Sequence, residues 1–220
     1  MNVSAVVLAA GTSDRFGARD KLLAEWRGRT LIEYVLDAAN NARLAGAVTE
    51  CVVVAPATAT RIKSLAVGEG FRVAHPPADA PMSASLKTAI SALAPGAEGV
   101  VVLLGDQPMV TGDAIRAVIK AAKKSPQALV RAHYRGYADT LSHPVFIGRY
   151  HFGLVHQFGG DRGFRGDRGQ AWASVDRGLA RWRQSGHRFR GGSRPTALMV
   201  GWYPPRPLAR LRRWPYFLQS

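Results

Sequence analysis

The stretch Gly99-Val-Val-Val-Leu-Leu-Gly-Asp-Gln-Pro108 decides the fold of this 220-residue chain. Residues 99–104 are apolar at every position, which is typical of a central strand in a parallel sheet covered by helices on both faces. The apolar runs Val3–Ala9 and Cys51–Ala55 predict two further buried strands. Shorter strands are predicted at Phe71–Ala74, Ala128–Ala132 and Pro144–Ile147.

Segments with helical periodicity separate these strands. Helices are predicted at Thr30–Ala42, Thr58–Ala66, Ser83–Leu93, Thr111–Lys124 and Gly148–Gln157. Thr30 and Glu33 have the spacing of a capping box, and Thr111 is placed as the N-cap of its helix. This alternation of strands and helices predicts the α/β class.

Composition excludes several classes of protein. With 47% hydrophobic and 20% charged residues, the chain is not disordered as a whole. Cys51 is the single cysteine, which excludes an internal disulfide and a multi-cysteine zinc site. No apolar run reaches the roughly 18–20 residues that span a bilayer, and no basic region precedes the first apolar run. We therefore expect a cytoplasmic protein without a membrane partner.

The net charge of +15 is concentrated at the C-terminus. Residues 171–220 contain ten arginines, no lysine and a single acidic residue, Asp176. The composition changes near residues 159–169, after which Arg, Pro, Gly and Trp dominate and no strand periodicity is present. We predict a domain at residues 1–165 followed by an atypical segment, 166–220, of irregular structure.

The loop after the first strand is the first candidate for a site. It reads Leu8-Ala-Ala-Gly-Thr-Ser-Asp-Arg-Phe-Gly17, with Lys21 shortly after it. Small residues let a backbone approach a ligand closely, and exposed N–H groups can hold phosphate oxygens. Arg15 and Lys21 would supply fixed positive charge. The alternative is an ordinary turn with solvated basic residues.

Asp106 is the second candidate, because it follows the strongest strand, where open α/β sheets bind ligands. A carboxylate there could hold Mg²⁺, or it could instead bond its own backbone before Pro108. The serines of Met82–Leu86 could cap a helix or contact an anionic ligand. A lone histidine such as His143 is more often structural than catalytic, and His151 and His156 do not have the spacing of a zinc site.

Taken in series, these segments resemble the molybdenum cofactor nucleotidyltransferases, the MobA/MocA-like branch of the NTP-transferase superfamily. The family's pattern Leu-Ala-Ala-Gly-x-Ser-x-Arg-x-Gly…Lys is present, as are close matches to Gly-Met-Ser-x-Ser-Leu, Gly-Asp-x-Pro, Gly-His-Pro-Val and Gly-Asp-x-Gly. Pro81 and Ser142 stand where two of these motifs usually have glycine. The matching segments are Leu8–Gly17, Lys21, Met82–Leu86, Gly105–Pro108, His143–Val145 and Gly160–Gly163.

The resemblance implies a Rossmann-like three-layer sandwich of the nucleotide-diphospho-sugar transferase type, with a mostly parallel sheet. It implies transfer of CMP or GMP from CTP or GTP to molybdopterin, with Mg²⁺ and release of pyrophosphate. Leu-Ala-Ala-Gly, in place of Leu-Ala-Gly-Gly, is more similar to the cytidylyl-transferring members, so CTP is expected first and GTP second. A recipient molybdoenzyme would be a further partner.

The resemblance also implies a role for each matching residue. Arg15, Lys21 and Asp106 would be catalytic, and Asp106 would hold the metal. His143, Pro144 and Asp161 would contact the pterin substrate. The nucleotide would be bound by Leu8, Ala9, Ala10, Gly11, Thr12, Ser13, Met82, Ser83 and Ser85.

The chain departs from the family at its end, where members usually carry Asp-x-Asp-Thr-Pro with a second metal ligand. Asp176 lies in no such motif. Three interpretations of the tail are open: an extension that binds a polyanion through Arg and Trp, a diverged terminus in which Asp161 or Asp167 takes over as ligand, or a frameshifted end, which the abrupt Lys-free composition favours.

Other functions compete with this interpretation. The acceptor could be a sugar phosphate or a polyol phosphate, or the chain could be an inactive homologue that carries the cofactor. A nucleic-acid-binding module would use arginine and tryptophan, but these gather only in residues 162–220 and form no groove-entering motif. Nucleic acid is therefore not the expected partner.

Overall fold

A computed structural model of the chain describes residues 1–11, 21–78, 81–124, 129–134, 143–157, 179–180 and 198–203. Within these ranges, no helix is both long and apolar enough to cross a membrane. The strands are β1 (Val3–Leu8), β2 (Glu25–Trp26), β3 (Arg29–Thr30), β4 (Glu50–Val54), β5 (Arg72–Ala74), β6 (Gly99–Leu104), β7 (Leu129–Tyr134), β8 (Val145–Gly148), β9 (Leu179–Ala180) and β10 (Leu198–Tyr203). The helices are η2 (Lys21–Leu23), α1 (Leu31–Leu44), α2 (Thr60–Gly68), α3 (Met82–Ser91), α4 (Gly112–Ala122), η3 (Arg149–His151) and α5 (Phe152–Val155).

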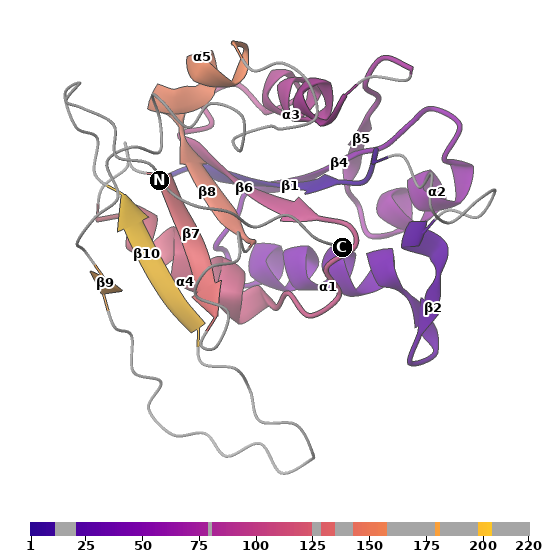
Figure 1. Cartoon of the computed structure of the whole chain (residues 1–220), viewed down its shortest axis with the longest axis horizontal. Helices are drawn as coiled ribbons and strands as arrows, with labels where there is room; N and C mark the ends of the chain where they lie inside the picture. Colours follow the sequence, from indigo (N-terminus) through magenta and orange to yellow (C-terminus); the bar gives the residue numbers. More distant parts are fainter. Residues whose placement is uncertain are drawn as a thin grey trace, which may run out of the picture.

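Eight strands form one sheet in the order β5-β4-β1-β6-β8-β7-β10-β9. The neighbours from β5 to β6 pair in parallel, and each pair from β6 to β9 is antiparallel. Six of the eight strands therefore run in one direction, and β8 and β10 run in the other. The sheet is mostly parallel, as the sequence predicts, and β6 lies near its middle (Figure 1).

Helices cover both faces of the sheet, so the predicted three layers are confirmed. One apolar cluster joins the sheet to α1, α2 and α4, and a second joins it to α3 and α5. Alternate residues of β1 serve the two clusters, since Val3, Ala5 and Val7 belong to the first and Val6 to the second. In Figure 1, α3 and α5 lie above the sheet, with α1 and α4 below it.

The structure confirms both predicted helix starts. The Glu33 carboxylate accepts hydrogen bonds from the backbone N–H of Thr30 (2.8 Å) and from its hydroxyl (2.6 Å). At the start of α4, the Thr111 hydroxyl accepts from the backbone N–H of Ala114 (3.2 Å). Each contact satisfies a donor at or beside a helix terminus, which is why these sequence positions begin helices.

Three local expectations differ from the structure. Gly148–Gln157 contains the turn η3 and the four-residue helix α5 in place of one continuous helix, and Gly148 itself ends β8. The short hairpin β2–β3 was not predicted, because two-residue strands carry too few side chains to show a period.

In the segment predicted to be irregular, β9 and β10 join the sheet, and all of β10 pairs with β7. The apolar and aromatic run Leu198-Met-Val-Gly-Trp-Tyr203 is the signal that could have identified β10. The boundary at residues 165 and 166 stays a prediction.

Glu50 joins three segments at the amino edge of the sheet. Its carboxylate accepts hydrogen bonds from the Ser4 hydroxyl (2.7 Å), the Ala94 backbone N–H (2.7 Å) and the Arg72 guanidinium. Partial burial raises the pKa of Glu50, but the three donors outweigh burial and hold this pKa below its usual value. The charged carboxylate therefore stabilises the folded state.

Replacing Glu50 with glutamine is expected to lower the free energy of unfolding by about 1–2 kcal/mol at pH 7. Because the folded pKa lies below the unfolded pKa of roughly 4.3, this stabilisation is complete above pH 5 or so. It is lost as the pH falls through the folded pKa. Urea unfolding of the wild type and Glu50→Gln between pH 7 and pH 3 should show that their difference in free energy of unfolding becomes smaller. A difference that does not change with pH would contradict this role of Glu50.

Cys51 is enclosed between β4 and α1. Its side chain is 4% exposed, and its Sγ lies 3.8 Å from the carbonyl oxygen of Ala39. Burial raises the pKa of this thiol to about 12. We expect a disulfide reagent at pH 8 to modify the native protein at least about a thousandfold more slowly than the protein in urea. Equal rates under the two conditions would show that the thiol is accessible.

Candidate functional site

Four parallel strands end at one edge of the sheet, and most of the predicted site residues follow them. The backbone N–H of Ala9 donates to the carbonyl of Val54 (2.8 Å), and that of Gly105 donates to the carbonyl of Leu8 (2.9 Å). These bonds extend the pairing of β1 past its last residue on both sides. The loops after β1 and β6 are thus held next to each other.

The loop after β1 is described as far as Gly11. Leu8 and Ala10 are partly buried and Ala9 is 4% exposed, so the chain leaves the sheet on small side chains. Gly11 is exposed, and a Cβ there would meet no atom within 4 Å, so the backbone at this residue is accessible to a ligand. Thr12, Ser13 and Arg15, to which we assigned binding and catalytic roles, lie outside the described residues.

Lys21 and Asp106, predicted separately, lie in direct contact. The Lys21 Nζ is 3.0 Å from the Asp106 Oδ2, and their side chains are 40% and 36% exposed. Lys21 belongs to η2 and Asp106 follows β6, so 85 residues of sequence separate the two partners. An ammonium group and a carboxylate therefore face solvent together beside the loop after β1.

Gly105 explains how these two side chains meet. A Cβ at this position would lie 2.9 Å from Ile32 Cδ1, 3.2 Å from Leu22 Cδ1 and 3.2 Å from the carbonyl oxygen of Leu8. Only glycine lets η2 and α1 pack this closely against the end of β6. Leu22 is buried at 8% exposure, which fixes the turn that carries Lys21. No role was predicted for Leu22 or Ile32; the glycine in Gly-Asp-x-Pro is the signal that could have indicated close packing at this point.

The hairpin β2–β3 connects the turn carrying Lys21 to α1. The backbone N–H of Ala24 donates to the Lys21 carbonyl, and that of Leu31 donates to the Ala24 carbonyl, each at 3.1 Å. The Tyr34 hydroxyl donates to the Trp26 carbonyl at 2.9 Å, and the rings of these two residues meet edge to face with centroids 5.1 Å apart. The hairpin is therefore held against α1 through both backbone and side chains.

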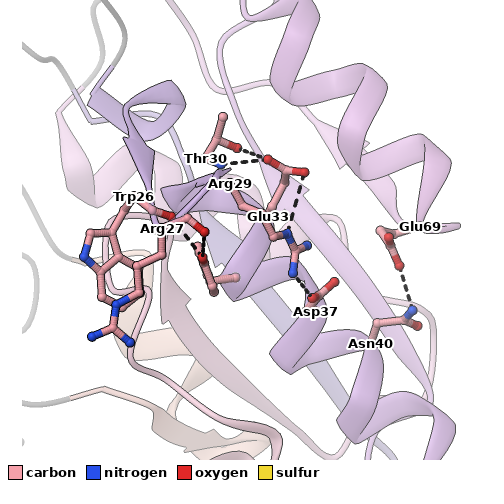
Figure 2. Close-up of polar contacts among 9 residues, drawn as sticks. Trp26, Arg27, Arg29, Thr30, Glu33, Asp37, Asn40 and Glu69 are labelled. Atoms are coloured by element: carbon pink, nitrogen blue, oxygen red, sulfur yellow. Dashed lines mark hydrogen bonds and ion pairs between the residues drawn. The ribbon is translucent and has the colours of Figure 1, made fainter. Parts of the chain in front are cut away.

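Charged groups on α1 add to this connection, as Figure 2 shows. The Arg29 guanidinium donates to the Asp37 carboxylate at 2.6 Å and lies 4.0 Å from Glu33. The hydrogen bonds from Thr30 hold the pKa of Glu33 below its usual value. Arg27 at the hairpin tip stacks on Trp26, with its Cζ 4.5 Å from the ring centroid.

The start of α3 reaches the same edge of the sheet. Met82 is 46% exposed, whereas Ser83 and Ser85 are only 2% and 3% exposed. The two serine side chains thus lie on the covered face of α3, and Met82 is the side chain of this segment that faces solvent. A ligand at this surface would meet Met82 and the backbone of the first turn before either hydroxyl.

His143 and Pro144 immediately precede β8 at this edge, on the far side of β6 from β1. β8 pairs Val145 with Val102 of β6, and the backbone N–H of Ala132 donates to the Pro144 carbonyl at 2.9 Å. The His143–Pro144 peptide bond is cis. Asp161, predicted to act with them, lies outside the described residues.

Asp106 is the described residue that best fits a metal. No group of three or more His, Cys, Asp or Glu side chains gathers around a common point in the described part of the chain. Mg²⁺ typically binds through one or two carboxylates and completes its shell with substrate phosphates and water. A single half-exposed carboxylate therefore suits a cation that arrives with a phosphate ligand, and does not suit a cation enclosed by protein.

A separate hollow of about 460 Å³ lies along the outer face of α3. Its lining includes none of the predicted site residues. The residues around it are Ala74, His75, Pro77, Ala84, Lys87, Thr88, Ser91, Ala92 and His156.

The small-residue loop, the lysine and the aspartate lie at the carboxyl edge of parallel strands, which is where open α/β proteins bind their ligands. A model of the MobA-like NTP transferase domain matches residues 5–174. The chain therefore belongs to the MobA-like NTP transferase family, and its class of activity is nucleotidyl transfer. No curated protein sequence matches it.

Solved structures agree with this assignment. Rv0371c from Mycobacterium tuberculosis H37Rv is 29% identical, with a TM-score of 0.60 over 74% of this chain and 79% of that one. Its complex with manganese is 28% identical, with the same TM-score over 74% and 80%. Mth528, a nucleotidyl transferase from Methanothermobacter, is 26% identical, with a TM-score of 0.54 over 71% and 74%. A 4-diphosphocytidyl-2C-methyl-D-erythritol synthase from Anaerococcus prevotii, 18% identical with a TM-score of 0.57 over 71% and 75%, shares the fold.

Proposed function

We propose that this protein transfers CMP from CTP to molybdopterin and releases pyrophosphate. The observation that carries the proposal is the direct contact of Lys21 with Asp106 beside the loop after β1, within a chain of this family. A terminal phosphate oxygen of molybdopterin would attack the α-phosphorus of CTP. The bond between that phosphorus and the bridging oxygen to the β-phosphate would break, and pyrophosphate would carry the electron pair away.

Phosphoryl and nucleotidyl transfers depend mainly on positioning and charge neutralisation. Arg15 and Lys21 would offset the charge that develops around the α-phosphate, and the backbone of residues 11–13 would hold the phosphates. The exposed side of Gly11 and the small side chains before it support close approach of the triphosphate. Leu8–Ser13, with Met82, Ser83 and Ser85, would bind the nucleotide.

Asp106 would hold Mg²⁺, which when bound withdraws charge from the phosphate oxygens. The manganese complex of Rv0371c, which is 28% identical to this chain, supports a divalent cation here. The structure leaves Asp106 36% exposed, so a phosphate-bound cation has access to it. His143, Pro144 and Asp161 would contact the pterin, and the position of β8 across β6 from β1 supports separate nucleotide and acceptor sides.

CTP is proposed ahead of GTP because Ala10 stands in the motif Leu-Ala-Ala-Gly. The test is pyrophosphate release from CTP and from GTP in Mg²⁺, with molybdenum-loaded molybdopterin as acceptor and with a sugar phosphate and a polyol phosphate as alternatives. Release with CTP and molybdopterin supports the proposal. Pyrophosphate release with another nucleotide or acceptor would replace CTP or molybdopterin in the proposal. Binding of molybdopterin without pyrophosphate release would identify a cofactor carrier.

A further inference from the structure

We propose that Lys21 is the counterion of Asp106 in the nucleotide-free protein. A divalent cation would then bind Asp106 only together with the nucleotide. The inference rests on the proposed function for its ligand, a nucleoside triphosphate. It adds a property of the free protein, namely a carboxylate already occupied by an internal cation. Lys21 would thus control when the metal binds, besides neutralising phosphate charge.

The geometry makes the two cations competitors. At 3.0 Å the Lys21 ammonium group contacts Asp106 Oδ2, one of the two oxygens that a metal ion could use. A divalent cation bound to this carboxylate would lie within a few ångströms of the ammonium group, and like charges at that separation repel. The ammonium group and the metal therefore compete for the carboxylate, and each weakens the binding of the other.

The contact is easily exchanged. Both side chains are more than one-third exposed. An ion pair with this exposure is weak, and its loss changes the equilibrium between the paired and unpaired states by only about two- to fivefold. The backbone around the pair does not need to move, because Gly105 and the buried Leu22 hold η2 against the end of β6. The exchange is a rotation of the flexible lysine side chain.

A triphosphate supplies what the exchange requires. Its phosphates carry more negative charge than one carboxylate, and the end of β1 lies beside the residue that precedes Asp106, because the Gly105 backbone N–H donates to the Leu8 carbonyl. Once Lys21 turns to the phosphates, Asp106 is left free for the cation that those phosphates carry. Nucleotide and metal would thus bind cooperatively, since each removes the other's competitor.

The test is a titration of the nucleotide-free protein with Mn²⁺, followed by water proton relaxation. Lys21→Gln is expected to bind Mn²⁺ at least about threefold more tightly than the wild type, because the competing charge is gone. Lys21→Arg, which keeps the charge, should resemble the wild type. Lys120→Gln, a change at an exposed lysine on α4, should leave the affinity unchanged.

Two further arms identify the site. Asp106→Asn in the Lys21→Gln background should remove the gain in Mn²⁺ affinity. A non-reacting CTP analogue should reduce the difference in Mn²⁺ affinity between the wild type and Lys21→Gln. Unchanged or weaker Mn²⁺ binding by folded Lys21→Gln would overturn the inference, whatever the transfer assay shows. Tighter binding in a protein that releases no pyrophosphate would support the counterion role and reject the proposed reaction instead.

Discussion

Asp106→Asn is expected to reduce the rate of nucleotidyl transfer by about 10²–10³-fold, the loss typical when one group that stabilises transition-state charge is removed. An amide oxygen binds a hard divalent cation far less strongly than a carboxylate does. The side chain is 36% exposed and contributes to a solvent-exposed ion pair, so the thermal midpoint should change by less than about 2 °C. Pyrophosphate release and thermal unfolding measure the two effects.

Asp113→Asn provides the matched control. Asp113 is also an aspartate near the carboxyl end of β6, but it lies in the first turn of α4, is 74% exposed and pairs with Arg116. Transfer by this variant should stay within about twofold of the wild type, since exposed ion pairs contribute little. If Asp106→Asn retained activity within fivefold, Asp106 could not be the residue that holds the metal.

Buried strands were the part of the fold that could be predicted most closely. β6 has the predicted bounds, β1 ends one residue earlier than predicted, and β4 both begins and ends one residue earlier. Their uninterrupted apolar runs have one low-energy solution, a strand covered on both faces. The helices α1 and α4 were predicted at their starts because a capping side chain marks the first turn.

Short elements and long-range pairings could not be predicted this way. The hairpin β2–β3 and the strand β9 are each too short to produce a period, and β10 depends on a pairing with β7 that lies more than 60 residues away in the sequence. One continuous helix was also predicted at Gly148–Gln157, but Gly148 is the last residue of β8 and pairs with Gly99 of β6. Tertiary contacts decide such segments.

For the site, the sequence indicated the residue types and the edge of the sheet but not their contacts. Lys21 and Asp106 were each predicted, yet their ion pair requires η2 to pack on Gly105, which no local pattern reveals. Ser83 and Ser85 were predicted as nucleotide-binding residues from a motif, whereas their burial depends on how α3 is rotated over the sheet. Motifs identify residues that act together, and packing decides which atoms a ligand can reach.

β10 also bears on how the sheet is completed. The family match ends at residue 174, and β10 lies beyond it, yet β10 pairs along the whole length of β7. Without this partner, β7 would present a row of unpaired backbone groups at an edge of the sheet. Part of the arginine-rich segment therefore has a structural role in the sheet, independent of any ligand that its charge attracts.

The largest expected effect on stability comes from Gly99→Ala. Gly99 begins β6 between β1 and β8, where it pairs with Val3 and Gly148. A Cβ at Gly99 would overlap the ring of Phe146 and would lie 3.3 Å from the carbonyl oxygen of Ile147. Phe146 is fully buried in β8, so its ring can move only if neighbouring core side chains move with it. We expect the free energy of unfolding to fall by about 3 kcal/mol, and the thermal midpoint by roughly 6–12 °C.

Gly153→Ala is the control for this change, because a Cβ there would meet no atom within 4 Å and Gly153 lies in α5. Its midpoint should stay the same or rise slightly, since alanine favours a helix over glycine by up to about 1 kcal/mol. Adding Phe146→Leu to Gly99→Ala should recover part of the lost stability, although Phe146→Leu alone is destabilising. Such a positive coupling, measured by urea unfolding of all four proteins, would assign the effect to the overlap of Gly99 with the ring. Additive losses would show that the strand accommodates a methyl group in some other way.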